Sequence, residues 1–412
     1  MAPSSPMLTV LLLASCAAVA LFLFRSRMAR GDLWHATLTP LSSIIGSGFL
    51  IMAPLLASIV GPMAPVAILG IVLFAFAIGH VIRFNILHVE PRLADGRLHK
   101  GTREIEYLGN VVLVGAYIIA VAFYLSLLSS FLLGYLGVDD PDTERGLTTI
   151  MIVFIAGVGY LKGLGGLERL ESISVTIQLC VIASLITGLA IYGFGFLTEG
   201  ELHLDFPQRD VFTQLQMLAG ALLVVQGFET SRFLGERYSP EIRVKSMRNA
   251  QLISGFIYVV SVILLMPVVQ AMDLVHIRLA QIVDAVAPVA LILPVMLMIA
   301  ALTSQFSAAV ADSGGAGGLL RENSHGHLSV RMGYVSVAAA AILLVWAVNL
   351  LEIVALASRA FAAYYFLQTL LALIYNYRDS PQRSRLRRVD TCLFIALALI
   401  LAYIVAFSIP AE

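Results

Sequence analysis

Apolar runs of about twenty residues recur along the whole chain, and their length constrains the fold more than any other feature. A helix of that length crosses roughly 30 Å of hydrocarbon. Inside lipid, every backbone N–H and C=O needs a partner within the protein, which leaves only helices and closed barrels. Because the runs are continuously apolar and do not alternate with period two, they predict an all-α membrane protein.

Twelve transmembrane helices can be drawn along the sequence. Their predicted bounds are 7–24, 36–60, 64–88, 105–136, 147–162, 168–197, 211–236, 248–271, 283–312, 331–349, 351–376 and 391–409. Every second connecting segment is basic, and together these segments hold 22 of the 26 Lys and Arg residues. The positive-inside rule places them in the cytoplasm and both termini on the outer side. We therefore expect a multi-pass protein of the cell (inner) membrane.

Composition and motifs disfavour several classes of function. The net charge is zero and no basic tail exists, so nucleic acid is not an expected partner. The three cysteines lie inside apolar runs, which does not suggest a disulfide framework or a thiolate metal site. No span brings together the groups that an enzyme needs, and no filter-like repeat indicates a channel. We expect no cofactor, with Na⁺ as a coupling ion the one exception considered.

Two predicted spans carry glycine and polar residues at mid-membrane. Residues 46–48 of span 36–60 read Gly-Ser-Gly, and each glycine lowers helix stability by about 1 kcal/mol. Residues 226–229 of span 211–236 read Gln-Gly-Phe-Glu, and an intramembrane carboxylate usually serves a site or a relay. The structural alternatives are close helix packing at the glycines and a hydrogen bond from Glu229 to exposed backbone.

The two interrupted spans occupy the first positions of two consecutive sets of five spans, 36–197 and 211–376. Five is odd, so the second set begins on the opposite face of the membrane, as in an inverted repeat. Interrupted helices at matching positions of two such halves indicate a binding site near the midplane. The predicted units are listed in chain order: an extra N-terminal helix (1–30), the first repeat (31–200), the second repeat (201–378) and a C-terminal helix (379–412).

Two stretches resemble motifs of a known family. S-S-I-I-G-S-G-F-L-I-M-A-P (42–54) resembles the first core helix of the amino acid–polyamine–organocation (APC) superfamily, and Q-G-F-E-T-S-R-F-L-G-E-R-Y-S-P-E-I-R (226–243) resembles the sixth. The resemblance covers roughly residues 36–376. It implies the five-plus-five inverted repeat of the leucine-transporter type, with substrate, commonly an amino acid or a related amine, held between core helices 1 and 6. The chain departs from the pattern at Ser42-Ser43, where the family has glycine-asparagine or glycine-glycine, so the substrate class stays open.

The resemblance also implies site residues by position. The predicted substrate-binding set is Ile44, Gly46, Ser47, Gly48, Phe49, Gly227, Phe228 and Glu229. N–H groups around Ser47, Gly48 and Phe49 would take a carboxylate. Carbonyls near Ile44 and Gly227 would take an ammonium group. Phe228 would be an aromatic gate, and Glu229 a polar switch that responds to substrate or to a proton.

A cation site is predicted on the span 283–312. In sodium-coupled members of this fold, two adjacent hydroxyl residues of core helix 8 face carbonyls of core helix 1. The predicted Na⁺ ligands are the carbonyls of Ser42, Ile45 and Ala300 and the side chains of Thr303 and Ser304. Such oxygen ligands suit a hard cation. The alternative is that both hydroxyls bond carbonyls of their own helix. No lysine between residues 167 and 196 replaces the sodium, as one can in sodium-independent relatives.

The leading functional hypothesis is therefore a Na⁺-coupled symporter for an amino acid or a related amine, with the lipid bilayer and the small-molecule substrate as its partners. The alternatives are a proton-coupled or exchanging permease of the same fold that uses Glu229, and a membrane sensor that moves nothing. Asp312, predicted to lie close to the inner mouth, would either help to release a cation or cap a solvated helix end. The sequence leaves the oligomeric state open.

Overall fold

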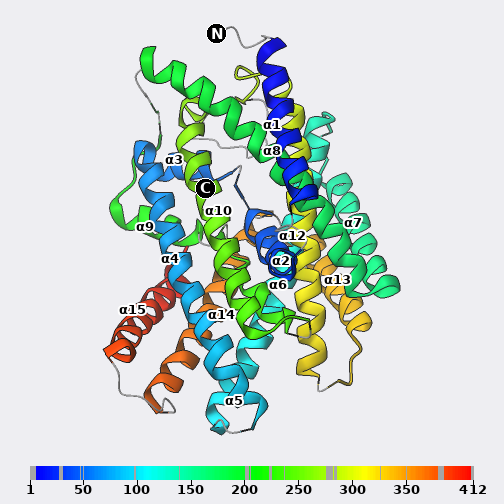
Figure 1. Cartoon of the computed structure of the whole chain (residues 1–412), viewed down its shortest axis with the longest axis vertical. Helices are drawn as coiled ribbons and strands as arrows, with labels where there is room; N and C mark the ends of the chain where they lie inside the picture. Colours follow the sequence, from blue (N-terminus) through cyan, green and yellow to red (C-terminus); the bar gives the residue numbers. More distant parts are fainter. Residues whose placement is uncertain are drawn as a thin grey trace.

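The computed structural model describes residues 6–26, 31–46, 48–49, 51–96, 99–138, 140–199, 204, 206–221, 225–235, 237–274, 282, 285–324, 326–348, 350–378 and 385–409. Within these ranges every regular element is a helix (Figure 1). The α-helices are α1 (Pro6–Arg25), α2 (Asp32–Gly46), α3 (Met52–Val60), α4 (Ala64–Phe84), α5 (Glu90–Ala94), α6 (Lys100–Tyr135), α7 (Pro141–Lys162), α8 (Leu164–Glu199), α9 (Val211–Gly220), α10 (Pro240–Val269), α12 (Leu293–Asn323), α13 (Val330–Ala347), α14 (Leu350–Arg378) and α15 (Arg385–Phe407). Three short elements are η2 (Gly61–Met63), the π-helical η3 (Asn85–Val89) and the 3₁₀-helical η5 (Phe228–Leu234).

The all-α membrane architecture is confirmed. Nine helical stretches of the described residues are long and apolar enough to cross a membrane, and Met7–Leu23 of α1 forms a shorter apolar helix. The two spans that carry glycine at mid-membrane are broken: α2 ends at Gly46 before α3 begins, and α9 ends at Gly220 before η5 begins. The count of twelve spans and the inverted repeat stay predictions.

One predicted span was misplaced by about three helical turns. The expected helix 283–312 is α12, which begins at Leu293 because Pro294 favours the first turn of a helix, and which continues to Asn323. The error arose because apolar residues precede the helix and glycines occupy its second half. As a result Asp312 lies inside the helix and not at its end.

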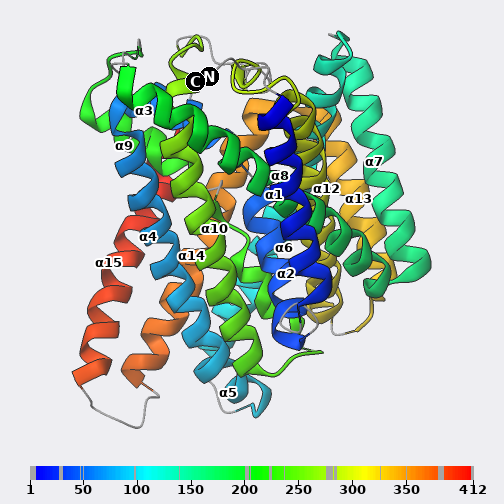
Figure 2. The same ribbon diagram turned by 45° about the horizontal axis from the view of Figure 1, so that its top comes forward.

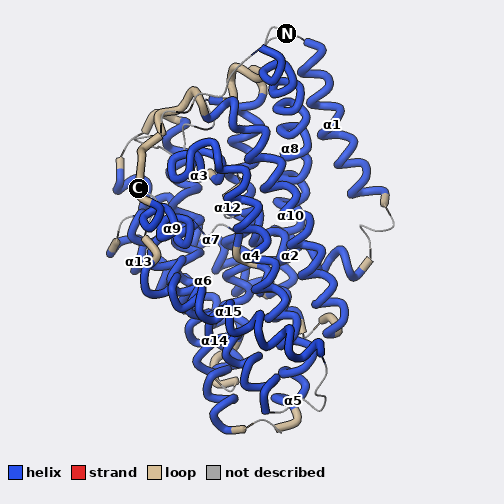
Figure 3. The backbone as a smooth tube through the Cα atoms, turned by 90° about the vertical axis from the view of Figure 1, so that its left-hand side faces the viewer, coloured by secondary structure: helices blue, strands red, loops and turns tan. Residues whose placement is uncertain are grey.

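The centre of the bundle is formed by α6, α12 and α14, with α10 and α2 beside them (Figures 1 and 2). Four tyrosines of the central helices are completely buried: Tyr117, Tyr124, Tyr364 and Tyr365. At the periphery, α1 packs along α8 and α15 packs on α14, and Figure 3 shows α1 along one edge of the molecule. The extra helices therefore cover the core from outside and do not enter it.

The start of α1 and the end of α15 point toward the same end of the bundle, and α5 marks the opposite end (Figure 2). The turn between α12 and α13 lies at the α5 end as well. This arrangement places segments that the sequence predicts to be cytoplasmic at one end. Which side of a membrane that end faces stays a prediction.

Candidate functional site

The first helix break is packed tightly against α12. A Cβ on Gly46 would lie 2.3 Å from the Cβ of Ala308 and 2.7 Å from the carbonyl oxygen of Ser304. The Gln305 side chain donates to the Gly46 carbonyl at 2.7 Å, which satisfies an acceptor that the helix end leaves free. Gly46 is therefore required by close packing. Ser47, a predicted substrate residue, lies outside the described residues.

The turn after the break reconnects the chain to α3. The amides of Ile51 and Met52 both donate to the Gly48 carbonyl at 3.1 Å. Phe49, predicted to contribute an N–H group to a carboxylate site, has a side chain that is only 1% exposed. The structure thus brings Gly46, Gly48 and Phe49 together in one buried turn, and their role toward substrate stays a prediction.

The second break lies directly against the first. Gly227 has φ +116°, a backbone conformation that favours glycine, and a Cβ there would lie 2.3 Å from the Ser43 hydroxyl oxygen. Its N–H donates to Glu229 Oε2 at 3.0 Å, and its carbonyl accepts from the Thr230 hydroxyl at 2.7 Å. The two glycine-containing segments, which are 181 residues apart between Gly46 and Gly227, therefore meet as the sequence predicted for a shared site.

Glu229 is completely buried at this contact. Besides the Gly227 amide, the Tyr365 hydroxyl donates to Oε2 at 2.6 Å, and the Tyr117 hydroxyl faces the carboxylate from α6. The other oxygen, Oε1, has no hydrogen-bond partner in the described part of the chain. Phe228, the predicted gate, stacks on Tyr365 with ring centroids 5.2 Å apart.

Asp312 is a second completely buried carboxylate, on α12. The Ser43 hydroxyl donates to its Oδ1 at 2.8 Å, and among the described residues Oδ2 has no partner. The expectation that Asp312 caps a solvated helix end is therefore wrong, because α12 continues for eleven residues beyond it. Correct placement of that span would have revealed an acidic residue at membrane depth, which is the signal that singled out Glu229.

Two carbonyls predicted to take an ammonium group already accept hydrogen bonds. The Tyr258 hydroxyl donates to the Ile44 carbonyl at 2.8 Å. The Thr230 hydroxyl donates to the Gly227 carbonyl, as described above. A carbonyl oxygen has two lone pairs, so each could accept a further donor. The ammonium site at Ile44 and Gly227 stays a prediction.

The predicted sodium ligands lie where α12 meets α2, close to Gly46. The Thr303 hydroxyl donates to the Ile299 carbonyl at 2.7 Å, and the Ser304 hydroxyl donates to the Ala301 carbonyl at 3.0 Å. Both hydroxyls thus donate to carbonyls of their own helix, as the structural alternative predicts. A sodium site at these residues stays a prediction. The three carbonyl residues of the set, Ser42, Ile45 and Ala300, are all completely buried.

A large cavity of about 890 Å³ lies between the two buried carboxylates and the α5 end of the bundle. We call it the vestibule. Its lining includes Thr39, Thr230 and Ala311. Thr230 and Ala311 are sequence neighbours of Glu229 and Asp312, and Thr39 lies one helical turn before Ser43. The vestibule therefore reaches the edge of the buried site without including either carboxylate.

Buried ion pairs cross the wall of the vestibule. Arg232 of η5 pairs with Glu90 of α5 at 2.9 Å and with Glu106 of α6 at 2.5 Å. Arg243 of α10 pairs with the second oxygen of Glu90 at 2.9 Å and donates to the Arg232 carbonyl at 2.6 Å. Because both arginines are less than a tenth exposed, this network holds the segment after the second break against α5 and α6.

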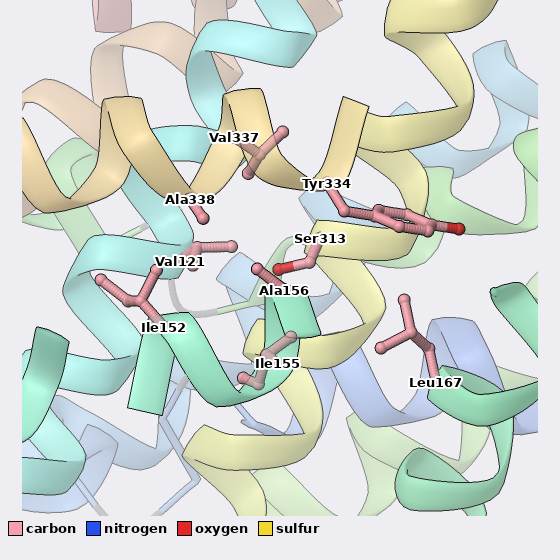
Figure 4. Close-up of a pocket in the computed structure, with 9 residues that line it drawn as sticks. All are labelled: Val121, Ile152, Ile155, Ala156, Leu167, Ser313, Tyr334, Val337 and Ala338. Carbon is pink, nitrogen blue, oxygen red and sulfur yellow. The ribbon is translucent and has the colours of Figure 1, made fainter. Parts of the chain in front are cut away.

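A second, much smaller pocket lies where α12 packs against α6, α7 and α13 (Figure 4). Its walls are apolar apart from the Ser313 hydroxyl and Tyr334, and it shares Leu167 and Tyr334 with the vestibule. Its volume is about 10 Å³, near the lower limit for one water molecule. This pocket is too small to hold an amino acid or an amine.

The chain was compared with known proteins. A family model described as "APC superfamily transporter" matches residues 26–408. A protein of Aquifex aeolicus (strain VF5), described as uncharacterised, is 40% identical over 396 residues, which cover 95% of each chain. These matches include both helix breaks, both buried carboxylates and the vestibule. The chain belongs to the APC superfamily of transporters.

Proposed function

We propose that the protein is a secondary active transporter that moves an amino acid or a related amine across the membrane by alternating access. One observation carries the proposal: two broken helices meet at the completely buried carboxylate of Glu229. Helix breaks expose backbone donors and acceptors that a substrate with both carboxylate and ammonium groups can use. The negative charge of Glu229 favours a substrate that carries a positive charge.

The position of the vestibule supports alternating access. It extends to Thr230 and Ala311 from the α5 end, while the carboxylates beyond these residues are sealed. In this proposal the structure corresponds to a state open toward the cytoplasm. Opening toward the other side requires the segments around the two breaks to move relative to α6 and α12. The Arg232 ion pairs, which join the segment after the second break to α5 and α6, would have to adjust to this movement.

Sodium coupling through Ser42, Ile45, Ala300, Thr303 and Ser304 remains part of the proposal. One observation favours the proton-coupled alternative. Glu229 forms no ion pair in the described part of the chain, so its charge is balanced only by neutral hydrogen-bond donors. A buried carboxylate in such a place is stabilised by any positive charge that it takes up, including a proton.

The thermal stability of the purified protein tests both substrate and coupling ion. We would record melting curves with amino acids, amines and nucleobases, each in Na⁺ and in K⁺. A ligand at a hundred times its Kd stabilises the folded state by about 2.7 kcal/mol. Stabilisation by an amino acid or amine in Na⁺ alone supports the sodium symporter, and equal stabilisation in K⁺ supports the proton alternative.

The same assay with Glu229→Gln provides the matched variant, because glutamine keeps the shape and removes the charge. We expect this variant to lose the shift caused by the amine while the unliganded melt stays close to that of the wild type. An unchanged ligand shift would contradict the role of Glu229. Uptake into liposomes then separates a transporter from a sensor, since a sensor binds the ligand without moving it.

A further inference from the structure

The contact between Asp312 and Ser43 joins α12 to the helix that breaks at Gly46. Asp312 Oδ1 accepts from the Ser43 hydroxyl at 2.8 Å, and the same hydroxyl oxygen lies against Gly227. Gly227 in turn donates to Glu229. The two carboxylates are thus connected through one serine and one glycine, which places both of them at the meeting point of the two broken helices.

The groups that face Asp312 are acidic or neutral. They are Glu229 of η5, Glu171 of α8, Tyr117 and Tyr124 of α6 and Ser43 of α2. Within the described ranges no Lys, Arg or His forms an ion pair with Asp312. A buried negative charge without a positive partner is unfavourable. Binding of a positive charge in this region is therefore favoured.

The geometry distinguishes between kinds of positive charge. A sodium ion needs several oxygens arranged around it, whereas among the described residues Ser43 is the only hydrogen-bond partner of Asp312. An ammonium group needs space, whereas the vestibule ends at Ala311, one residue away. A proton needs only a lone pair, and Oδ2 of Asp312 has one without a partner among the described residues.

The vestibule approaches Asp312 through a second acidic residue. Glu171 of α8, which is buried near Asp312, is among the residues that line the vestibule. We propose that Asp312 is a proton-carrying residue of the transport cycle, which binds one proton from the vestibule and releases it when the broken helices move. This inference rests on the proposed transport function and adds a residue to its coupling mechanism.

Binding of the proton converts the Asp312 carboxylate to a neutral carboxylic acid, and no other bond is made or broken. The ionised carboxylate accepts a charge-assisted hydrogen bond from Ser43, which is stronger than a bond between neutral groups. Protonation therefore weakens the hold of α12 on α2. Because Ser43 lies one turn before the break, the charge on Asp312 biases the position of the first broken helix.

Infrared difference spectroscopy of the protein in lipid nanodiscs tests this without any substrate. A carboxylic acid that is buried and poorly hydrogen-bonded absorbs at higher frequency than the solvated acids of the surface. As pH is lowered and raised, we expect wild-type protein to gain and lose such bands reversibly. Asp312→Asn should lose one of them, while Glu322→Gln, a matched change on the same helix in the vestibule lining, should lose none.

Two further variants guard against a misfolded Asp312→Asn protein. Asp312→Glu should restore a titrating band at a shifted frequency, and Ser43→Ala should keep the Asp312 band but shift it, because the acid loses its hydroxyl partner. A purely structural role for Asp312 predicts no such band. Persistence of the full wild-type set of bands in Asp312→Asn would overturn the proposal.

Adding Na⁺ at constant pH gives an independent arm of the test. If Na⁺ but not K⁺ removes the Asp312 band, the residue is a sodium ligand and the proton assignment is wrong. Failure of the proposed function has a different signature. If no amino acid or amine is transported but the Asp312 band titrates, the proton site stands and the substrate assignment fails.

Discussion

Replacement of Gly227 by alanine tests the contact between the two broken helices. The residue has φ +116°, and the added Cβ would lie 2.3 Å from the Ser43 hydroxyl oxygen, 2.6 Å from its Cβ and 2.8 Å from the backbone nitrogen of Ile44. The positive φ costs an L-residue about 1–2 kcal/mol. Insertion of a methyl group into a packed core costs about 1–3 kcal/mol more.

Together these terms disfavour the observed arrangement by about 2–5 kcal/mol, since the backbone nitrogen of Ile44 cannot move as a side chain can. In a large chain, about 2 °C of melting temperature corresponds to each kcal/mol, so we expect Gly227→Ala to melt roughly 4–10 °C lower. Amine-dependent stabilisation should fall with it, because the displaced segment includes Glu229.

The matched control is Gly235→Ala in the same part of the chain. That residue has φ −66°, and its added Cβ would meet Arg243 at an ordinary contact distance of 3.5 Å. We expect its melting temperature to change by no more than about 2 °C, the equivalent of about 1 kcal/mol. If Gly227→Ala melts like the wild type while retaining its ligand response, the two breaks do not touch as described.

Three further predictions follow from the packing and the ion pairs. Arg232→Ala leaves the buried carboxylate of Glu106 unpaired, so we expect a loss of about 3–5 kcal/mol in unfolding experiments, against about 1 kcal/mol or less for the exposed Arg145→Ala; equal effects would contradict the burial of the Arg232 pairs. Gly46→Ala should lower the melting temperature, and Ala308→Gly should restore part of the loss, because their Cβ atoms would lie 2.3 Å apart; additive effects would contradict this contact. Finally, Na⁺ should raise the melting temperature in the absence of substrate if the predicted sodium site is formed, and the Thr303→Ala variant should abolish that rise; a rise equal in both proteins would refute the site.

The sequence was sufficient to predict an all-α membrane protein and the two breaks, whereas the span 283–312 was misplaced. Apolar runs of membrane-spanning length leave the backbone few alternatives, and glycines at residues 46 and 227 mark positions where close approach or positive φ excludes other residues. The contact between the two breaks was expected from their matching places in two predicted sets of five spans, and the inverted repeat itself stays a prediction. Both features depend on local composition or on order along the chain, which the sequence records directly.

The contacts that define the candidate site could not be predicted in the same way. Ser43 and Asp312 are 269 residues apart in the sequence. Tyr258 is 214 residues from Ile44, to whose carbonyl its hydroxyl donates. Such pairs depend on helix register, which hydropathy specifies only to within a few residues. The misplaced start of α12 moved Asp312 from the helix interior to an expected helix end, and this concealed the second buried carboxylate.

The ion pairs of the vestibule show the same limit. The positive-inside rule places basic segments in the cytoplasm, which predicts solvated side chains. The structure instead buries Arg232 between two carboxylates of different helices. A sequence pattern counts these charges but does not show that they form ion pairs with one another in the wall of the vestibule.

Counterflow in liposomes tests the central claim most directly. Purified protein would be reconstituted with an unlabelled amine or amino acid inside, chosen by its effect on the melting curve, and uptake of the labelled compound would be followed. We expect saturable uptake by the wild type and at least a tenfold loss in Glu229→Gln, the equivalent of about 1.4 kcal/mol. Glu104→Gln, a change at an exposed residue of α6 that does not line the vestibule, should leave uptake unchanged. Uptake that is the same in Glu229→Gln as in the wild type would contradict a substrate site at the two broken helices.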